Sequence, residues 1–317
     1  MIEYVFGLAD LGRLRFAISP SWELAASLQA LLKPSEAALH VEWVREVSPA
    51  LPDLDLRAAF ALLGHSSYIP DFLTPPPESP LTTIEEDLAR MLATPAAQIR
   101  KEVAIVAEDG DGPELQAFMA RPRHELRRLA RTFEEYWRRA LAPSWPRVNA
   151  LLQADLAARG RELAERGPVA ALDGLHPSAR WREDRLRVDV TLDRTCELGG
   201  RGLQLVPSAF HWTRPRAIIG APWQPTVIYP ARGVGLLWQR EDPAVDALGR
   251  VIGRTRARIL GALAAPASTT QLAERLGITP GGASQHLTAL AAAGLVAGQR
   301  HGREVLYLRT ERGNALI

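Results

Sequence analysis

The stretch PGGASQHLTALAAAGLV, residues 280–296, has the pattern of one short amphipathic helix. Thr279 comes directly before Pro280, and a hydroxyl cap followed by proline is a common helix start. At 100° per residue, one narrow face collects the apolar residues Ala283, Leu287 and Leu290, together with Gly294. The opposite face holds residues 281, 284, 285, 288 and 292, which are small or polar and uncharged. The stretch therefore predicts a helix over 279–294 that packs through its apolar stripe.

The uncharged outward face favours contact with DNA, because an ordinary solvated helix face carries charges. Small side chains let a helix enter the major groove, where Gln pairs with adenine and Ser or Thr bonds base edges or phosphates. Two glycines at the helix start allow close backbone approach to a phosphate. His286, on the flank of the stripe, either bonds a phosphate or packs. The candidate contact residues on this helix are Thr279, Gly281, Gly282, Ser284, Gln285, His286 and Thr288.

The neighbouring segments also have clear patterns. ALGRVIGRTRARILGALAAPA, residues 247–267, predicts one helix. STTQLAERLG, residues 268–277, has Ser268 and Gln271 at capping-box spacing and a terminal glycine. LVAGQRHGREVLYLRT, residues 295–310, predicts two short strands that meet at His301 and Gly302.

Taken together, these segments resemble the winged helix-turn-helix of the ArsR-type bacterial repressors, over about 70 residues. In that family the second helix of the pair reads the major groove, and the hairpin wing touches the DNA backbone beside it. The resemblance implies that Ser284, Gln285 and Thr288 read bases. It places Arg300, His301 and Arg303 in the wing, where they suit phosphate or minor-groove contact. Double-stranded DNA is therefore the expected partner.

Charge is unevenly distributed along the 317-residue chain. The whole sequence has a net charge of +2, but residues 244–317 contain nine arginines and four acidic residues, a net charge of +5. The remainder is then mildly acidic, at −3. A basic terminal module on an acidic body is a weak indication of nucleic-acid binding.

The patterns predict an α+β protein in which a mostly helical N-terminal domain, residues 1–178, precedes a small β-rich segment, residues 179–241. The winged helix-turn-helix then occupies residues 242–317. Ser19 and Pro20 predict one early helix start, and TTIEEDLARML predicts another after a proline-rich loop. The β-rich segment is expected to belong to the N-terminal domain. It contains four tryptophans that either line a ligand pocket or fill a small core: Trp181, Trp212, Trp223 and Trp238.

The long N-terminal part resembles an uncharacterised domain found ahead of such modules in high-GC bacterial regulators, through LGRLRFAISPSWELAASLQAL and LVPSAFHW. That resemblance implies no activity. No GxSxG, HExxH or P-loop motif occurs, so we expect no enzyme and no cofactor. Metal sensing is disfavoured, because Cys196 is the single cysteine and the seven histidines never fall at ligand spacing.

The chain contains no apolar run long enough to span a membrane, and its N-terminus lacks the apolar region of a signal peptide. We therefore expect a cytoplasmic protein without membrane contact. The sequence predicts a homodimeric transcription regulator, a repressor that responds to a small organic ligand held by the N-terminal domain. The alternative is a winged-helix protein-interaction module with a structural N-terminal dimerisation arm.

Overall fold

The computed structural model describes residues 1–34, 37–64, 68–190, 193–211, 214–238, 243–264, 266–301 and 304–317. The chain divides into two compact units, Met1–Val234 and Gly235–Ile317. Helices predominate and the sheets are small, so the α+β class expected from the sequence is confirmed.

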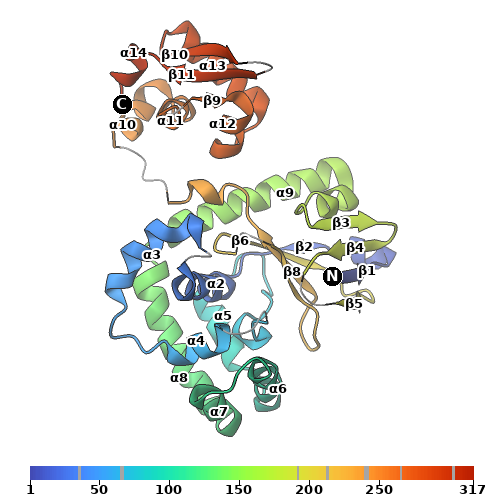
Figure 1. Cartoon of the computed structure of the whole chain (residues 1–317). Coiled ribbons are helices and arrows are strands. Elements are labelled where there is room, and N and C mark those ends of the chain that lie inside the picture. The colour runs from blue at the N-terminus through green and yellow to red at the C-terminus, as the bar shows by residue number, and fades with distance from the viewer. Residues whose placement is uncertain are drawn as a thin grey trace. The chain divides into compact units, whose positions relative to one another are not determined.

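Helices make up most of the first unit (Figure 1). Its α-helices are α1 (Leu8–Leu11), α2 (Pro20–Leu32), α3 (Val41–Val47), α4 (Arg57–Leu63), α5 (Ile84–Leu92), α6 (Ala96–Ala107), α7 (Pro113–Ala120), α8 (Pro122–Tyr136) and α9 (Trp145–Asp173). Short 3-10 turns are η2 (Ala38–His40), η3 (Ser48–Ala50) and η4 (Asp71–Leu73), and η5 (Trp137–Leu141) is a π-helical turn. The long helix α9 is kinked at Gly167, where φ is +81° and Pro168 follows.

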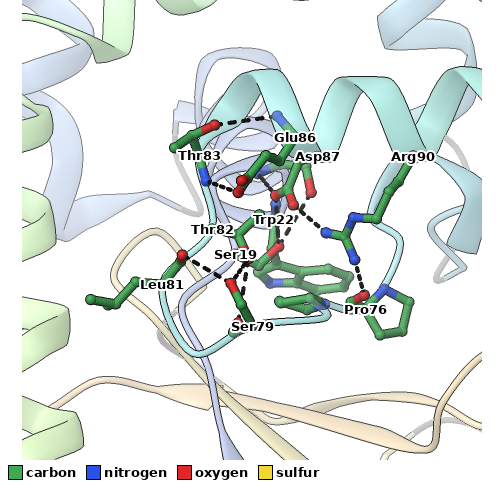
Figure 2. A network of polar contacts seen from close by, with 12 residues as sticks. Ser19, Trp22, Pro76, Ser79, Leu81, Thr82, Thr83, Glu86, Asp87 and Arg90 are labelled. Atoms are coloured by element: carbon green, nitrogen blue, oxygen red, sulfur yellow. Dashed lines mark hydrogen bonds and ion pairs between the residues drawn. The ribbon is translucent and has the colours of Figure 1, made fainter.

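The predicted starts of α2 and α5 are confirmed, and one polar network joins them (Figure 2). Ser19 caps α2 by accepting a hydrogen bond from the backbone N–H of Trp22, at 3.2 Å. Thr83 and Glu86 form a reciprocal capping box at the start of α5. The buried carboxylate of Asp87 accepts a hydrogen bond from the Ser21 N–H at 2.9 Å and pairs with Arg90. The network therefore fixes the first turn of α2, which carries Trp22.

The strands of the first unit form two four-stranded sheets, with the orders β3-β4-β1-β5 and β2-β6-β8-β7. Chain direction is parallel for the pairs β1-β5, β2-β6 and β6-β8, and antiparallel for the pairs β1-β4, β3-β4 and β7-β8. The strands are β1 (Ile2–Val5), β2 (Arg15–Phe16), β3 (Ala179–Arg182), β4 (Arg185–Val188), β5 (Arg194–Glu197), β6 (Gln204–Ser208), β7 (Arg216–Ile218) and β8 (Thr226–Pro230).

Four of these strands differ from the sequence-based expectation. Within the β-rich segment, the stretches DRLRVDVTL, LQLVPSAFHW, RAIIG and PTVIYP have the patterns of strands, and they correspond to β4, β6, β7 and β8; no such pattern predicts β1, β2, β3 or β5. β1 and β2 lie in a region that reads as mostly helical, yet they pair with strands nearly 200 residues away; Ile2, for example, lies opposite Val188. Strands of two to four residues are too short for a reliable alternation pattern, so only their distant partners define them.

A buried carboxylate joins α2 to the end of β6. Glu23 is fully buried and accepts hydrogen bonds from the backbone N–H groups of Ala209 and Phe210, each at 3.1 Å. Burial raises the pKa of Glu23 to about 7, although these hydrogen bonds oppose the shift. The ring of Phe210 stacks on His40, and burial lowers the pKa of that imidazole to about 4. Helix and sheet are thus held together by contacts between residues far apart in sequence.

The second unit contains α10 (Pro243–Ile252), α11 (Arg254–Ala262), β9 (Ala267–Ser268), α12 (Thr269–Leu276), α13 (Pro280–Ala292), β10 (Val296–His301), β11 (Glu304–Arg309) and α14 (Glu311–Asn314), after the turn η6 (Val234–Leu236). The single helix predicted over 247–267 is wrong. α10 ends before Gly253, where φ is +92°, and α11 begins directly after it. A side chain at Gly261 would come within 3.0 Å of Val245, so the two helices pack closely where glycine leaves room.

Among the described residues, no helix is both long and apolar enough to cross a membrane. The same residues contain no cluster of three metal-ligating side chains.

Candidate DNA interface and ligand pocket

The cap contacts predicted for α12 and α13 are confirmed. Ser268 and Gln271 form a reciprocal capping box, with Gln271 Oε1 accepting from the Ser268 N–H at 2.9 Å. Gly277 ends α12 with φ at +66°, a conformation that favours glycine. Thr279 Oγ1 then caps α13 by accepting from the Gly282 N–H at 3.1 Å, with Pro280 at the first helical position. Two helices joined by a tight turn follow directly from these local signals.

The apolar face of α13 packs as its periodicity predicts. Ala283, Leu287 and Leu290 are almost completely buried. Leu287 and Leu290 lie in the hydrophobic core of the unit with Leu260 of α11 and Leu272 of α12. Burial of this stripe fixes which side of α13 points outward.

The outward face carries the predicted base-reading residues. Ser284, Gln285 and Thr288 are all exposed. Thr288 Oγ1 donates its hydrogen to the Ser284 carbonyl at 2.9 Å, so the hydroxyl oxygen remains available as an acceptor. The side chain of Gln285, which carries an amide donor and an amide acceptor, is exposed. His286 is half-buried at the edge of this face.

The first turn of α13 is open on its outer side. Gly281 is exposed, and a Cβ added there would meet no atom within 4 Å. Its backbone is helical, so neither packing nor strain within the chain requires glycine at this position. Glycine in a helix costs about 0.5–1 kcal/mol relative to alanine. A close approach by another molecule would explain Gly281, and Gly282 follows it beside the Thr279 cap.

A β-hairpin follows α13, as the sequence predicts. β10 and β11 are antiparallel from Val296 opposite Arg309 to His301 opposite Glu304, and β9 pairs with β11. Arg300 is exposed near the tip. Arg303 and the side chain of His301 lie outside the described residues, so their predicted roles stay predictions.

The first unit contains a cavity of about 780 Å³. Helix α6 and the turn η4 provide one wall, and β7 with the loop before it provides another. Trp22, carried by the fixed first turn of α2, lines the cavity. Its other lining residues include Ile2, Tyr68, Asp71, Gln98, Lys101, Glu102, Arg194, His211, Arg214 and Arg216.

The three described tryptophans of the β-rich segment do not line this cavity. Trp181 packs edge-on against Phe6, with ring centroids 5.1 Å apart, and Trp238 is buried. Trp223 Nε1 donates to Glu102 Oε1 at 3.0 Å from outside the lining. Trp212 lies outside the described residues. Trp181 and Trp238 therefore fit the core alternative, whereas Trp223 binds a residue of the cavity lining.

Sequence reasoning missed the lining residues, although one signal was present. Glu102 lies on the buried face of α6, between the fully buried Ile99 and Val106. A carboxylate in an apolar stripe is costly unless it is bonded, which is a reason to look for a site there. Asp71 and Arg216 have no comparable signal, because only tertiary folding brings them to this cavity.

Comparisons with known proteins agree with the division into two regions. Residues 254–299, which span α11 to most of β10, match the family model of a helix-turn-helix domain. Residues 97–235 match a family of unknown function, DUF5937. No curated protein matches the chain, and no solved structure does. The chain therefore carries a C-terminal helix-turn-helix domain, preceded by a region similar to the DUF5937 family, and the former indicates a DNA-binding regulator.

Proposed function

We propose that the protein is a homodimeric, sequence-specific transcription regulator that represses its target genes and responds to a small organic ligand bound in its N-terminal unit. The observation that carries the proposal is the outward face of α13. It is exposed, small and uncharged around Ser284, Gln285 and Thr288. Such a face fits the major groove, where hydrogen bonds to base edges give specificity.

Other features of the second unit support contact with the DNA backbone. The N-terminal turn of α13 presents N–H groups beside Gly281, which suits a phosphate. Arg300 adds a positive charge near the hairpin tip, and Arg303 follows it in sequence. We infer a homodimer because one recognition helix reads only a few base pairs, whereas a two-fold dimer reads a palindrome. The cavity supports the ligand response, because its volume lies in the range of small-molecule sites.

The first test is fluorescence anisotropy of the full chain on DNA from upstream of its own gene, with random DNA of equal length as the control. A regulator should bind its specific fragment at least about a thousandfold more tightly. The logarithm of the binding constant should also fall linearly with the logarithm of the salt concentration. Equal binding to both DNAs would contradict sequence-specific regulation. No binding to either, with or without the ligands tested below, would favour the protein-interaction alternative.

Repression needs a second readout. In vitro transcription from the bound promoter should decrease as the protein is added. An increase in transcription would show that the protein is an activator, and the proposal of DNA recognition would be unaffected.

The oligomeric state is tested by sedimentation. The free protein should sediment as a dimer, and a monomer both on DNA and in solution would contradict the proposed homodimer.

A further inference from the structure

The two walls of the cavity differ in charge. Asp71 comes from η4 and Glu102 from α6, and Glu108 and Asp109 directly follow α6. Arg194 comes from β5, Arg214 from the loop before β7, and Arg216 from β7. Lys101 of α6 is the exception on the first wall. A ligand in the cavity therefore meets both carboxylates and guanidinium groups.

The acidic wall favours a cation at its buried end. Glu102 is almost completely buried and accepts hydrogen bonds from the Phe72 N–H at 2.8 Å and from Gln98 Nε2 at 2.5 Å. Burial raises the pKa of Asp71 well above its ordinary value, and the charge of Glu102 raises it further. A cationic group beside these two carboxyls would offset both effects.

The basic wall favours an anion. Burial lowers the pKa of Arg216, so an anionic group beside it would stabilise the charged guanidinium. Arg214 and Arg194 are exposed at the same wall and add positive charge. A planar guanidinium matches the two oxygens of a carboxylate.

Two buried polar atoms in the lining lack a partner among the described residues. These are Nε1 of Trp22 and Nε2 of His211. Burial and the charge of Arg216 lower the pKa of His211 to about 3, so the ring is neutral at physiological pH. Apolar residues complete the lining: Ile2, Ile69, Ile105, Val190 and Ile219.

We propose that this cavity binds a small zwitterion with an apolar side chain, a free amino acid or a short peptide. Its ammonium group lies toward Asp71 and Glu102, and its carboxylate lies toward Arg214 and Arg216. Its apolar side chain contacts the isoleucines. The binding itself stands apart from DNA recognition; only the consequence, a change in DNA affinity, rests on the proposed function.

The primary test is a thermal-shift screen of the full chain, followed by calorimetry. One panel contains the twenty common L-amino acids, and a second contains dipeptides of apolar residues, which separates the two sources of this chemistry. We expect members of at least one panel to bind. Blocking either end of a binder, as the N-acetyl or the C-terminal amide form, should weaken it by about tenfold or more, because each block removes a charge-assisted pair. No binder in either panel, or equal binding of the blocked forms, would overturn the proposal.

Variants of the two walls locate the ligand. Asp71→Asn should weaken the zwitterion by about tenfold or more and leave its N-acetyl form unaffected. Arg214→Gln, at an exposed position, should weaken the zwitterion while leaving its amide form unaffected. Arg123→Gln, on the exposed face of α8, is the matched control and should change nothing. Unchanged affinity in both wall variants would rule out this cavity.

The two proposals can fail separately. A zwitterion that binds and shifts DNA affinity supports both. A zwitterion that binds without changing DNA affinity supports the cavity and contradicts the ligand response. Binding of the zwitterion by a chain that never binds DNA supports the cavity and contradicts the regulator.

Discussion

The two candidate sites differ in how far apart their residues lie along the chain. The predicted DNA contacts on α13 all fall between Thr279 and Thr288, within one helix and its cap. The cavity of the first unit collects residues from Ile2 to Ala221 and from both sheets. The contacts that hold the two regions differ in the same way. Thr279 accepts a hydrogen bond from an N–H group three residues away, whereas Glu23 accepts hydrogen bonds from N–H groups 186 and 187 residues away.

This difference determines how substitutions act. On α13 the side chain of Gln285 is exposed and lies outside the core, so DNA binding can be changed there with little effect on stability. In the first unit, groups that line the cavity also hold separate elements together. Glu102 of α6, for example, binds Phe72 of η4 and Trp223 of the loop between β7 and β8. Changes there alter both the fold and the site.

The largest expected effect comes from the buried stripe of α13. Leu287→Ala should destabilise the second unit by about 2–5 kcal/mol and abolish DNA binding, because the side chain is fully buried in that core. Urea unfolding followed by circular dichroism measures the loss. Leu316→Ala, at a 41% exposed leucine, is the matched control. A loss no larger than that of the control would show that the stripe does not hold the helix.

Glu23 tests the long-range contact. Its folded-state pKa of about 7 exceeds the ordinary 4.5, so the folded chain binds more protons between these values. Stability should therefore fall as pH rises through this window, by about 3 kcal/mol from this group. Glu23→Gln should lose this component, as measured by urea unfolding at pH 4.5 and 8. His40 titrates in both the wild type and the Glu23→Gln variant, so its contribution cancels from the difference between them. The same pH dependence in Glu23→Gln as in the wild type would contradict the assignment, and Glu46→Gln controls for an exposed carboxylate.

Gln285 tests base reading. Gln285→Ala should cost about 1–3 kcal/mol at one base position and relax specificity there. Stability should not change, because the side chain is exposed. Anisotropy on a panel of single-base operator variants gives the preference. Gln153→Ala, an exposed glutamine on α9, should leave it intact. Unaltered base preference in Gln285→Ala would mean that α13 sits differently on DNA.

The hairpin should contribute without specificity. Arg300→Ala should weaken binding to every DNA alike and reduce the salt slope by about one, because one phosphate contact is lost. The same is expected of Arg303→Ala. A salt titration of specific and random DNA separates this from base reading. If only the specific DNA lost affinity, the hairpin would be reading bases instead.

The smallest expected effect comes from Gly281, where one substitution should raise stability and lower DNA affinity. Gly281→Ala should stabilise the fold by about 0.5–1 kcal/mol yet weaken DNA binding, because the new methyl group obstructs a close approach. Gly160→Ala is the matched control, since Gly160 is also exposed, helical and open on its outer side. It should stabilise the chain equally without affecting DNA. Unchanged DNA affinity in Gly281→Ala would remove the argument for close backbone approach.

Elements whose signals are local can be predicted from the amino-acid sequence alone. The Thr279 cap, the Ser268 and Gln271 box, the glycine end of α12 and the stripe of α13 all depend on residues within one or two helical turns. The same holds for the α2 and α5 starts and for the hairpin. At these positions periodicity and capping specify the structure, because each contact partner lies close in the chain.

The remaining features depend on contacts between residues far apart in the chain. The turn at Gly253 divides a continuous helical pattern, because α10 and α11 gain by packing on each other where glycine gives room. β1 and β2 exist because strands nearly 200 residues away accept their hydrogen bonds. The cavity joins Asp71, Glu102 and Arg216 from three separate elements. Strand pairing and cavity lining are set by contacts across the fold, for which a short sequence window holds no signal.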